Sequence, residues 1–229
     1  MGGPVIRAKN LTKIYNPGRP NEVIALQGAS LEIQPGESVI IEGPSGSGKS
    51  TLLSLLGVLD RPSQGQVMIE DEAVERLSDF WMSKLRREKI GFIYQRFNLI
   101  AGLKAWENVG YPLIPAGVPR RERRERACAL LERLGIGHRV EHSVEEISGG
   151  EAQRVSIARA LINSPQIIFA DEPSSNIDLA TMEGVIEIFN ELKEEGKTLV
   201  LSTNDPFMGD FGKKTITLRD GRIEDIVAK

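Results

Sequence analysis

Residues 43–50 read GPSGSGKS, and this stretch decides the fold. It matches G-x-x-x-x-G-K-[ST] in full, a pattern whose glycines let backbone N–H groups curl around phosphate oxygens. The apolar run 38–41 (SVII) before it predicts a buried strand, and the stretch 51–59 (TLLSLLGVL) after it predicts a helix. A simple Gly/Ser turn is the structural alternative, but a strand before the loop and a helix after it favour a nucleotide site.

The residue types in this loop suit a nucleotide with its metal ion. The positive end of the following helix would face the phosphates, and Lys49 would reach the β- and γ-phosphates as a point charge. The Ser50 hydroxyl would bind Mg²⁺. The loop therefore predicts a nucleoside triphosphate and Mg²⁺ as ligands.

A pair of carboxylates follows a second buried-strand candidate, QIIFADEP (166–173). Ligands of open α/β folds bind at the carboxyl edge of the sheet, which is where this strand would deliver Asp171 and Glu172. Asp171 suits Mg²⁺, and Glu172 suits polarising an attacking water. Two ordinary surface acids would be the alternative, which Pro173 and the apolar run make less favoured.

The order of the predicted elements indicates an α/β fold. Strand and helix alternate, and continuous apolar strands predict a mostly parallel sheet covered on both faces. The first forty residues are predicted to form short strands, and Asp220-Gly221 predicts a hairpin near the end. Residues 97–164 have helical character and are predicted to be an insertion in the α/β core.

A second anion site is predicted within this insertion. Ser148-Gly149-Gly150 directly precedes a helix whose apolar face includes Val155, Ala158 and Ile162. A helix start with small residues binds anions. Two such sites in one chain are unexpected, unless the second serves the nucleotide of another molecule.

Composition excludes several classes of function. Among 229 residues the net charge is −3, which argues against binding nucleic acid through its phosphates. The run 120–126 (RRERRER) is predicted to be a solvated helix face rather than a nucleic-acid patch. The single cysteine, Cys128, is expected to be structural, and His138 and His142 are expected to have surface roles rather than to bind metal. No signal peptide and no apolar run of about 18–20 residues is found, so a cytoplasmic location is expected.

The motifs together resemble the nucleotide-binding subunit of an ABC transporter, over essentially the whole chain. In the family's order, Tyr15 resembles the aromatic residue that stacks on adenine, residues 43–50 the Walker A loop and Gln95 the Q-loop glutamine. Residues 148–151 resemble the signature motif, Asp171 and Glu172 the Walker B aspartate and catalytic base, and 174–178 (SSNID) the D-loop. Each motif alone is weak to moderate, but their joint order and spacing are specific.

The resemblance implies a fold and a set of site residues. The fold is a P-loop NTPase core with an N-terminal antiparallel β subdomain, in which residues 1–229 form one ATPase domain: 1–96 and 165–229 the core, 97–164 the helical signature-motif subdomain. The resemblance assigns catalytic roles to Glu172, Lys49, Gln95 and Asn204. It assigns metal binding to Ser50, Gln95 and Asp171. ATP is assigned to Tyr15, Gly43, Ser45, Gly46, Ser47, Gly48, Lys49, Ser50, Thr51, Ser148, Gly149, Gly150 and Asp178.

The resemblance also implies partners and a mode of action. LDRPSQGQV, WENVGYPL and SGGEAQRVSIARAL look like subunits that serve lipoprotein release, macrolide-type efflux and cell division. Two subunits would pair head to tail around two ATP molecules, as a homodimer or a mixed dimer, which explains the second anion site. A separate membrane permease would dock near Gln95, at a surface with Phe97 and Leu99, and hold the subunit on the inner face of the cell membrane.

Two positions depart from the family pattern. In the stretch LVLSTNDP (199–206), the resemblance implies that the strand LVLS opens onto the γ-phosphate, and Asn204 stands where the family usually has a switch histidine. An amide donates a hydrogen bond but carries no titratable charge. Hydrolysis is then slowed, or the assembly mixes two different subunits, or the site tolerates asparagine because Glu172 and Lys49 remain. Glu151 stands where glutamine is commonest and places an acid near a site meant for ATP.

The expected function is therefore an ATPase that energises a membrane permease, for export or mechanical work. The alternative is a regulatory switch that binds ATP with little turnover. A soluble ABC protein of DNA repair or translation is less favoured, because those proteins usually carry large insertions or tandem cassettes.

Overall fold

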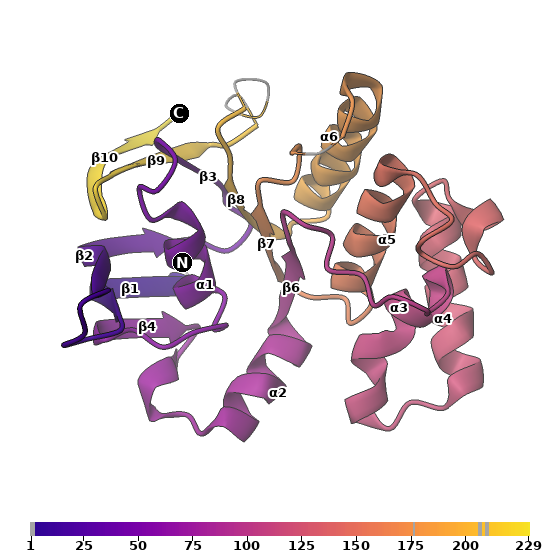
Figure 1. The fold of residues 1–229 in the computed structure, drawn as a ribbon, viewed down its shortest axis with the longest axis horizontal. Coiled ribbons are helices and arrows are strands. Elements are labelled where there is room, and N and C mark those ends of the chain that lie inside the picture. Colours follow the sequence, from indigo (N-terminus) through magenta and orange to yellow (C-terminus); the bar gives the residue numbers. More distant parts are fainter. Residues whose placement is uncertain (1–2, 176, 206–207, 209–210) are drawn as a thin grey trace.

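Two β-sheets and the helices around them make up the structure, a computed structural model that describes residues 3–175, 177–205, 208 and 211–229. Helix α1 (Lys49–Leu56) lies between the two sheets and contacts strands of both. The remaining long helices lie mainly on the other side of the second sheet (Figure 1). The mixed α/β architecture confirms the predicted fold class.

The first sheet is antiparallel and has the strand order β2-β1-β4-β5. Its two longest strands have ten and eleven residues, so the prediction of short strands in the first forty residues was wrong. Register shifts interrupt their pairing in three places and break the apolar–polar alternation that marks a strand in the sequence. The strands are β1 (Ile6–Tyr15), β2 (Val23–Ile33), β4 (Gln64–Ile69) and β5 (Glu72–Ala73).

The second sheet is mostly parallel, as predicted, with the order β10-β9-β3-β8-β7-β6. Only the β9–β10 pair is antiparallel, and it forms the predicted hairpin at Asp220-Gly221, where both residues have positive φ. The strands are β3 (Ser38–Glu42), β6 (Ile90–Ile93), β7 (Ile167–Asp171), β8 (Thr198–Ser202), β9 (Lys214–Arg219) and β10 (Arg222–Ala228). The carboxyl ends of the parallel strands carry most of the predicted site.

The segment 97–164 is largely helical, as its sequence indicates. It contains α3 (Ala105–Gly110), α4 (Arg120–Arg133) and α5 (Gly149–Leu161), with 3₁₀ turns η2 (Tyr111–Ala116) and η3 (Gly137–Arg139). The charged run 120–126 lies on α4, where Arg121 pairs with Glu125 and Arg126 with Glu122, one turn apart. These side chains are mostly exposed, so the run forms the predicted solvated face.

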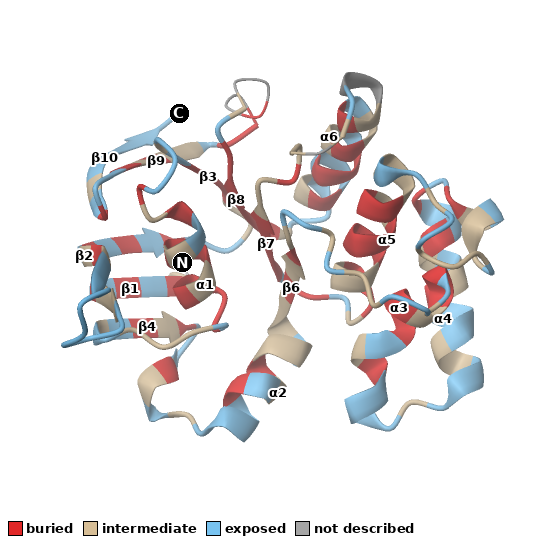
Figure 2. Cartoon of the chain, viewed as in Figure 1, coloured by how far each residue is buried: buried red, intermediate tan, exposed pale blue. Residues whose placement is uncertain are grey.

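The buried residues, red in Figure 2, form two apolar cores. Alternate residues of one strand enter different cores: Val39 and Ile41 of β3 pack toward α1 and the first sheet, and Ile40 packs toward the helices. This is the period of two expected for a strand buried on both faces. Helix α6 (Leu179–Glu194) buries the face predicted for it, which includes Phe189.

Helix α2 (Asp79–Lys89) and the turn η1 (Val74–Arg76) were not predicted from the sequence. Phe80 and Trp81 at the start of α2 are 70% and 50% exposed, so the apolar residues of this helix do not mark its buried face. Within the described ranges, no helix is both long and apolar enough to cross a membrane.

Candidate functional site

The loop 43–50 joins β3 to α1 and depends on glycine at two positions. Gly43 has φ +146°, and a Cβ built there would lie 2.1 Å from the Leu218 carbonyl oxygen. Gly48 has φ +104°, and its Cβ would lie 2.5 Å from the Ala25 oxygen. At both positions φ has a value that residues with a side chain rarely adopt, and an added Cβ would clash with the backbone of another segment. Only glycine therefore fits at either position.

Lys49, at the start of α1, is only 5% exposed. Its Nζ donates to the carbonyl oxygens of Gly43 (2.8 Å) and Pro44 (3.2 Å), so the ammonium group lies across the loop. The buried Ser47 Oγ has no hydrogen-bond partner among the described residues. A buried cation held by carbonyls and an unsatisfied hydroxyl are what a loop shaped for an anion provides.

A cleft of about 640 Å³ opens beside this loop and gathers residues from distant parts of the chain. Gln95 and Glu172 line its far side, and Asp220-Gly221 of the hairpin closes another edge. Val23 and Ile24 of β2, both about half exposed, give the cleft an apolar end. The predicted residues that line it are Ser45, Gly46, Gly48, Lys49, Ser50, Thr51, Gln95 and Glu172.

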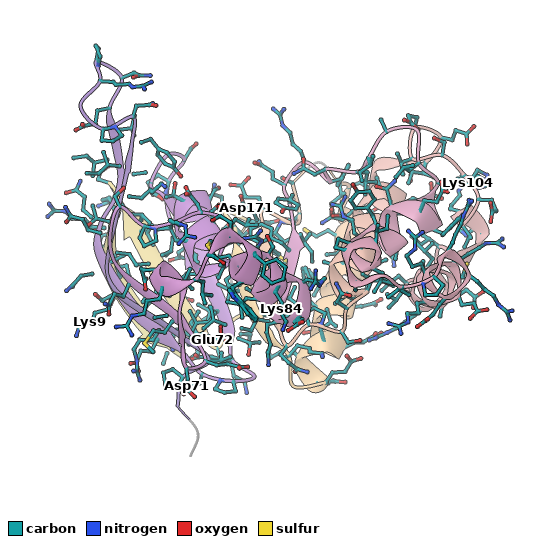
Figure 3. All side chains as sticks on the ribbon, turned by 90° about the horizontal axis from the view of Figure 1, so that it is seen from below. Lys9, Asp71, Glu72, Lys84, Lys104 and Asp171 are labelled. Carbon is teal, nitrogen blue, oxygen red and sulfur yellow. The ribbon has the colours of Figure 1, made fainter. Side chains whose placement is uncertain are left out.

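Two hydroxyl side chains meet at the carboxylate of Asp171, which Figure 3 labels on the part of the molecule that carries the sheets. Ser50 Oγ donates to Asp171 Oδ1 at 3.1 Å, and Ser202 Oγ donates to the same oxygen. Hydroxyl and carboxylate oxygens are the ligands that Mg²⁺ prefers, and Mg²⁺ needs few of them because it keeps waters and substrate phosphates. The residues present therefore fit the predicted metal.

Ser202 was missed as a site residue in the sequence, although it ends the strand LVLS. It is fully buried, and its contact with Asp171 follows from the parallel pairing of β7 with β8, in which these two residues are register partners. The only indication in the sequence was that Ser202 ends a buried strand, as Asp171 does.

Glu172 lies just past β7 with φ +44°, a left-handed conformation that is uncommon for a non-glycine residue. Its N–H donates to the Ser202 carbonyl oxygen at 2.9 Å, and its own carbonyl accepts from Ser175. These bonds fix the turn and aim the carboxylate at the cleft. Strain of this kind is found at functional sites.

Two amides hold the Glu172 carboxylate. Gln95 Nε2 donates to Oε2 at 2.8 Å, and Asn204 Nδ2 donates to Oε1 at 3.3 Å. Asn204 also lines a second hollow of about 490 Å³, together with Gly43 and Thr203. The structure thus brings together Lys49, Ser50, Gln95, Asp171, Glu172 and Asn204 from four segments of the chain.

Tyr15 lies at the end of β1, beside the apolar end of the cleft. Its backbone pairs with Val23, which lines the cleft, but Tyr15 is not itself among the lining residues. Its ring is contacted by Lys13 Nζ at 5.1 Å from the centroid. An assignment of Tyr15 to adenine remains a prediction.

Ser148, Gly149 and Gly150 line neither hollow, in the part of the chain that the structure describes. They form the N-terminus of α5, where Ser148 is the N-cap. Asp178 caps α6 by accepting from Thr181 N at 2.9 Å, and the Thr181 side chain lies against Gly150. The two helix starts are therefore neighbours, and Asn176 of the predicted D-loop lies outside the described residues.

The side chains expected to be unrelated to catalysis have structural contacts. His138 Nε2 lies 3.2 Å from Glu151 Oε1, and His142 Nε2 lies 3.3 Å from Arg139 Nη1. Cys128 is partly buried on α4, and burial raises the pKa of its thiol, which reduces its reactivity at neutral pH.

Comparisons with known proteins place these features in a family. The family model described as ABC transporter matches residues 26–175. An ABC transporter ATP-binding protein of Thermotoga maritima is 51% identical over 97% of this chain and 94% of its own length. The macrolide export ATP-binding/permease protein MacB of Hyphomonas neptunium is 45% identical over 97% of this chain, which spans 34% of that protein. The dimeric cassette MJ0796, solved in a post-hydrolysis state with ADP and Pi, has a TM-score of 0.91 and 42% identity over 97% of this chain and 98% of its own.

Proposed function

The chain belongs to the ABC transporter family, as its motifs predicted, and on that premise we propose that it is the ATP-hydrolysing subunit of a transporter whose permease is a separate chain. The Thermotoga relative is matched over nearly its full length, whereas the macrolide export proteins are about three times longer than this chain. The macrolide-export relatives agree with the subgroup that the sequence indicated.

One observation carries the proposal: the Glu172 carboxylate is held by two amides beside the glycine-dependent loop 43–50 and the cluster of oxygens at Asp171. This arrangement has a place for the phosphates, for the metal and for a water next to a carboxylate. Phosphoryl transfer needs little more than this positioning and charge stabilisation.

In this proposal the loop 43–50 and Thr51 hold the ATP phosphates, with Lys49 moving from the Gly43 and Pro44 carbonyls to the β- and γ-phosphates. Ser50 and Asp171 would bind Mg²⁺, with Gln95 as the third group, and the ion would neutralise charge on the phosphate oxygens. The adenine base would lie against the apolar end of the cleft, near Tyr15.

Glu172 acts as the base that polarises the attacking water. Gln95 holds one carboxylate oxygen and stays within reach of the metal site. Asn204 holds the other oxygen and donates to the γ-phosphate when ATP is bound. Since an amide has no charge to offer, Asn204 stabilises the developing negative charge less than an imidazolium would, and turnover is slowed.

A second subunit completes each site. Ser148, Gly149 and Gly150 of one copy would cap the γ-phosphate held by the other copy, since they line no hollow with their own phosphate loop. Asp178, next to Gly150 through Thr181, would lie at the same interface. The related cassette MJ0796 was solved as a dimer, which supports pairing of this kind. ATP closes the pair by charge-assisted bonds and hydrolysis releases it.

The permease would dock at a groove of about 340 Å³ between α2, β6 and the helical segment. Tyr94, next to Gln95, lines it with Arg86 and Arg159. Neither Phe97 nor Leu99, the two residues predicted for this surface, is among the described residues that line the groove, and Leu99 packs partly against the helical core. Tyr94 does line it and is the proposed contact in their place. Docking here would hold the subunit at the inner face of the membrane.

The groove is linked directly to the signature helix. Arg159 of α5 donates to the carbonyl oxygens of Phe97 (2.7 Å) and Asn98 (2.6 Å), just after the Q-loop. A shift of the groove is thereby passed to α5 and to Ser148 at its start. All three residues lie in the proposed helical subdomain (97–164), so the link would hold the start of that subdomain to α5 while residues 1–96 and 165–229 form the proposed core.

The test is steady-state phosphate release by the purified chain with Mg-ATP. We expect slow but measurable turnover, abolished by Glu172→Gln while ATP binding is retained. ATP binding with no release above that of Glu172→Gln would instead support the alternative, a regulatory switch, which the uncharged Asn204 favours. Failure to bind Mg-ATP in calorimetry would contradict both.

A further inference from the structure

The start of α5 carries a charged pair that the phosphate chemistry does not itself explain. Arg139, in the turn η3, donates from Nε to Glu151 Oε1 at 2.7 Å. The two side chains are 33% and 17% exposed, so the pair is substantially shielded from water. Glu151 is the acid that the sequence placed, unexpectedly, beside a site meant for ATP.

Glu151 shapes the helix start through a reciprocal capping arrangement with Ser148. Its other oxygen, Oε2, accepts from Ser148 N at 2.8 Å, and Glu151 N donates to Ser148 Oγ at 3.3 Å. The Ser148 oxygen is thus occupied as an acceptor, so its hydroxyl proton points elsewhere and is available for donation. A serine prepared in this way donates to a phosphate oxygen.

The same arrangement creates an electrostatic problem that Arg139 removes. A bare carboxylate three residues past Ser148 would repel the γ-phosphate that the partner copy presents to this helix start. Arg139 brings a positive charge onto the Oε1 side of the carboxylate, while Oε2 stays on the Ser148 amide. His138, at 3.2 Å from Oε1, and His142, at 3.3 Å from Arg139 Nη1, are the other titratable groups that face the pair.

We propose that Arg139 is a positioning residue for the shared ATP site: it holds and neutralises Glu151, so that Ser148 can approach the γ-phosphate of the nucleotide bound by the second copy. The inference rests on the proposed function, because it requires the α5 start of one copy to meet the nucleotide of another. Arg139 itself touches no nucleotide.

The experiment measures ATP-driven dimerisation in the Glu172→Gln background, where hydrolysis does not dissolve the dimer. Arg139→Ala should raise the dimer dissociation constant with Mg-ATP by about tenfold or more, the effect of losing one charge-assisted contact. Binding of Mg-ATP to the monomer, measured by calorimetry at low protein concentration, should not change. Arg133→Ala is the matched control, because Arg133 pairs with Glu191 and Glu195 away from α5.

A second substitution separates the role of Arg139 from simple packing. Glutamine keeps the capping arrangement without charge, so Arg139→Ala should cost little in a Glu151→Gln chain. The defect of Arg139→Ala alone should also shrink between about 0.05 M and about 0.5 M salt, because screening weakens repulsion. Arg139→Lys, which keeps the charge, should be intermediate and serves if the alanine variant does not fold.

The outcomes are distinct. A dissociation constant for Arg139→Ala equal to that of Arg133→Ala, or an equal defect with Glu151 and with Gln at position 151, overturns the inference. If the parent Glu172→Gln chain binds Mg-ATP and stays monomeric, the proposed head-to-tail function fails and the inference falls with it.

Discussion

Replacing Asn204 with histidine is expected to raise the steady-state rate of ATP hydrolysis. Asn204 Nδ2 lies 3.3 Å from Glu172 Oε1, beyond the usual range of about 2.7–3.2 Å for such a bond. Although the acceptor is a carboxylate, the donor is neutral and the bond is long, so its contribution falls below that of a well-formed charge-assisted bond, at about 0.5 kcal/mol. An imidazolium makes charge-assisted bonds that contribute about 1.5–3 kcal/mol.

The difference of about 1–2.5 kcal/mol corresponds to about a five- to seventy-fold rise in rate, if it acts on the charge that develops in the transition state. The gain should be largest near pH 6 and should fall as the pH rises past about 6.5, where an unperturbed histidine loses its proton. In the wild-type chain, position 204 adds no such pH dependence to the rate, because asparagine does not titrate.

The assay is phosphate release at saturating Mg-ATP, with thermal unfolding measured to confirm that each variant is folded. Asn204→Ala is the matched control and should be no faster than wild type. An unchanged or lower rate for Asn204→His would refute the reasoning and would mean that the site tolerates asparagine because the remaining groups carry the chemistry.

Three further perturbations test other parts of the account. Gly43→Ala should lower the free energy of unfolding by about 3 kcal/mol or more, which corresponds to about 6–12 °C in melting temperature. Gly46→Ala, where an added Cβ meets open space, should lower it by only about 1 kcal/mol. Equal losses for the two variants would count against the close approach at Gly43. Ser202→Ala should raise the Mg²⁺ concentration for half-maximal activity several-fold, and an unchanged magnesium titration would speak against the oxygen cluster. The pKa of Glu151 is lowered from 4.5 to about 2, chiefly by the Arg139 hydrogen bond, so the stability it adds is full above about pH 4.5 and is lost as the pH falls toward 2. The stability difference between wild type and Arg139→Ala should shrink over that interval, and a difference constant with pH would contradict this.

Features set by neighbouring residues could be predicted from the sequence. The phosphate loop, the helix after it and the hairpin at Asp220-Gly221 depend on short-range backbone conformations, and all lie where the sequence placed them. The strand ends that carry Asp171 and Asn204 were also predicted, because a fully buried strand is a continuous apolar run.

Features that depend on contacts between distant segments could not be predicted from the sequence. Ser202 reaches Asp171 only through the β7–β8 register, and Arg139 reaches Glu151 because a 3₁₀ turn packs beside α5. Helix α2 was missed because its two aromatic residues face solvent, and the length of β1 and β2 was hidden by bulges. The acid at Glu151, an anomaly in the sequence, becomes a helix cap once its partners are known.

The central claim is that one ATP is held by the Lys49 loop of one copy and by Ser148 of another. Light scattering on the Glu172→Gln chain tests it most directly, with Ser148→Glu added as the variant that opposes a phosphate. The account predicts dimers with Mg-ATP, monomers with Mg-ADP, and monomers with Mg-ATP once Ser148→Glu is present, although that chain still binds the nucleotide. A Glu172→Gln chain that stays monomeric while saturated with ATP, or a Ser148→Glu chain that dimerises as well as its parent, would contradict it.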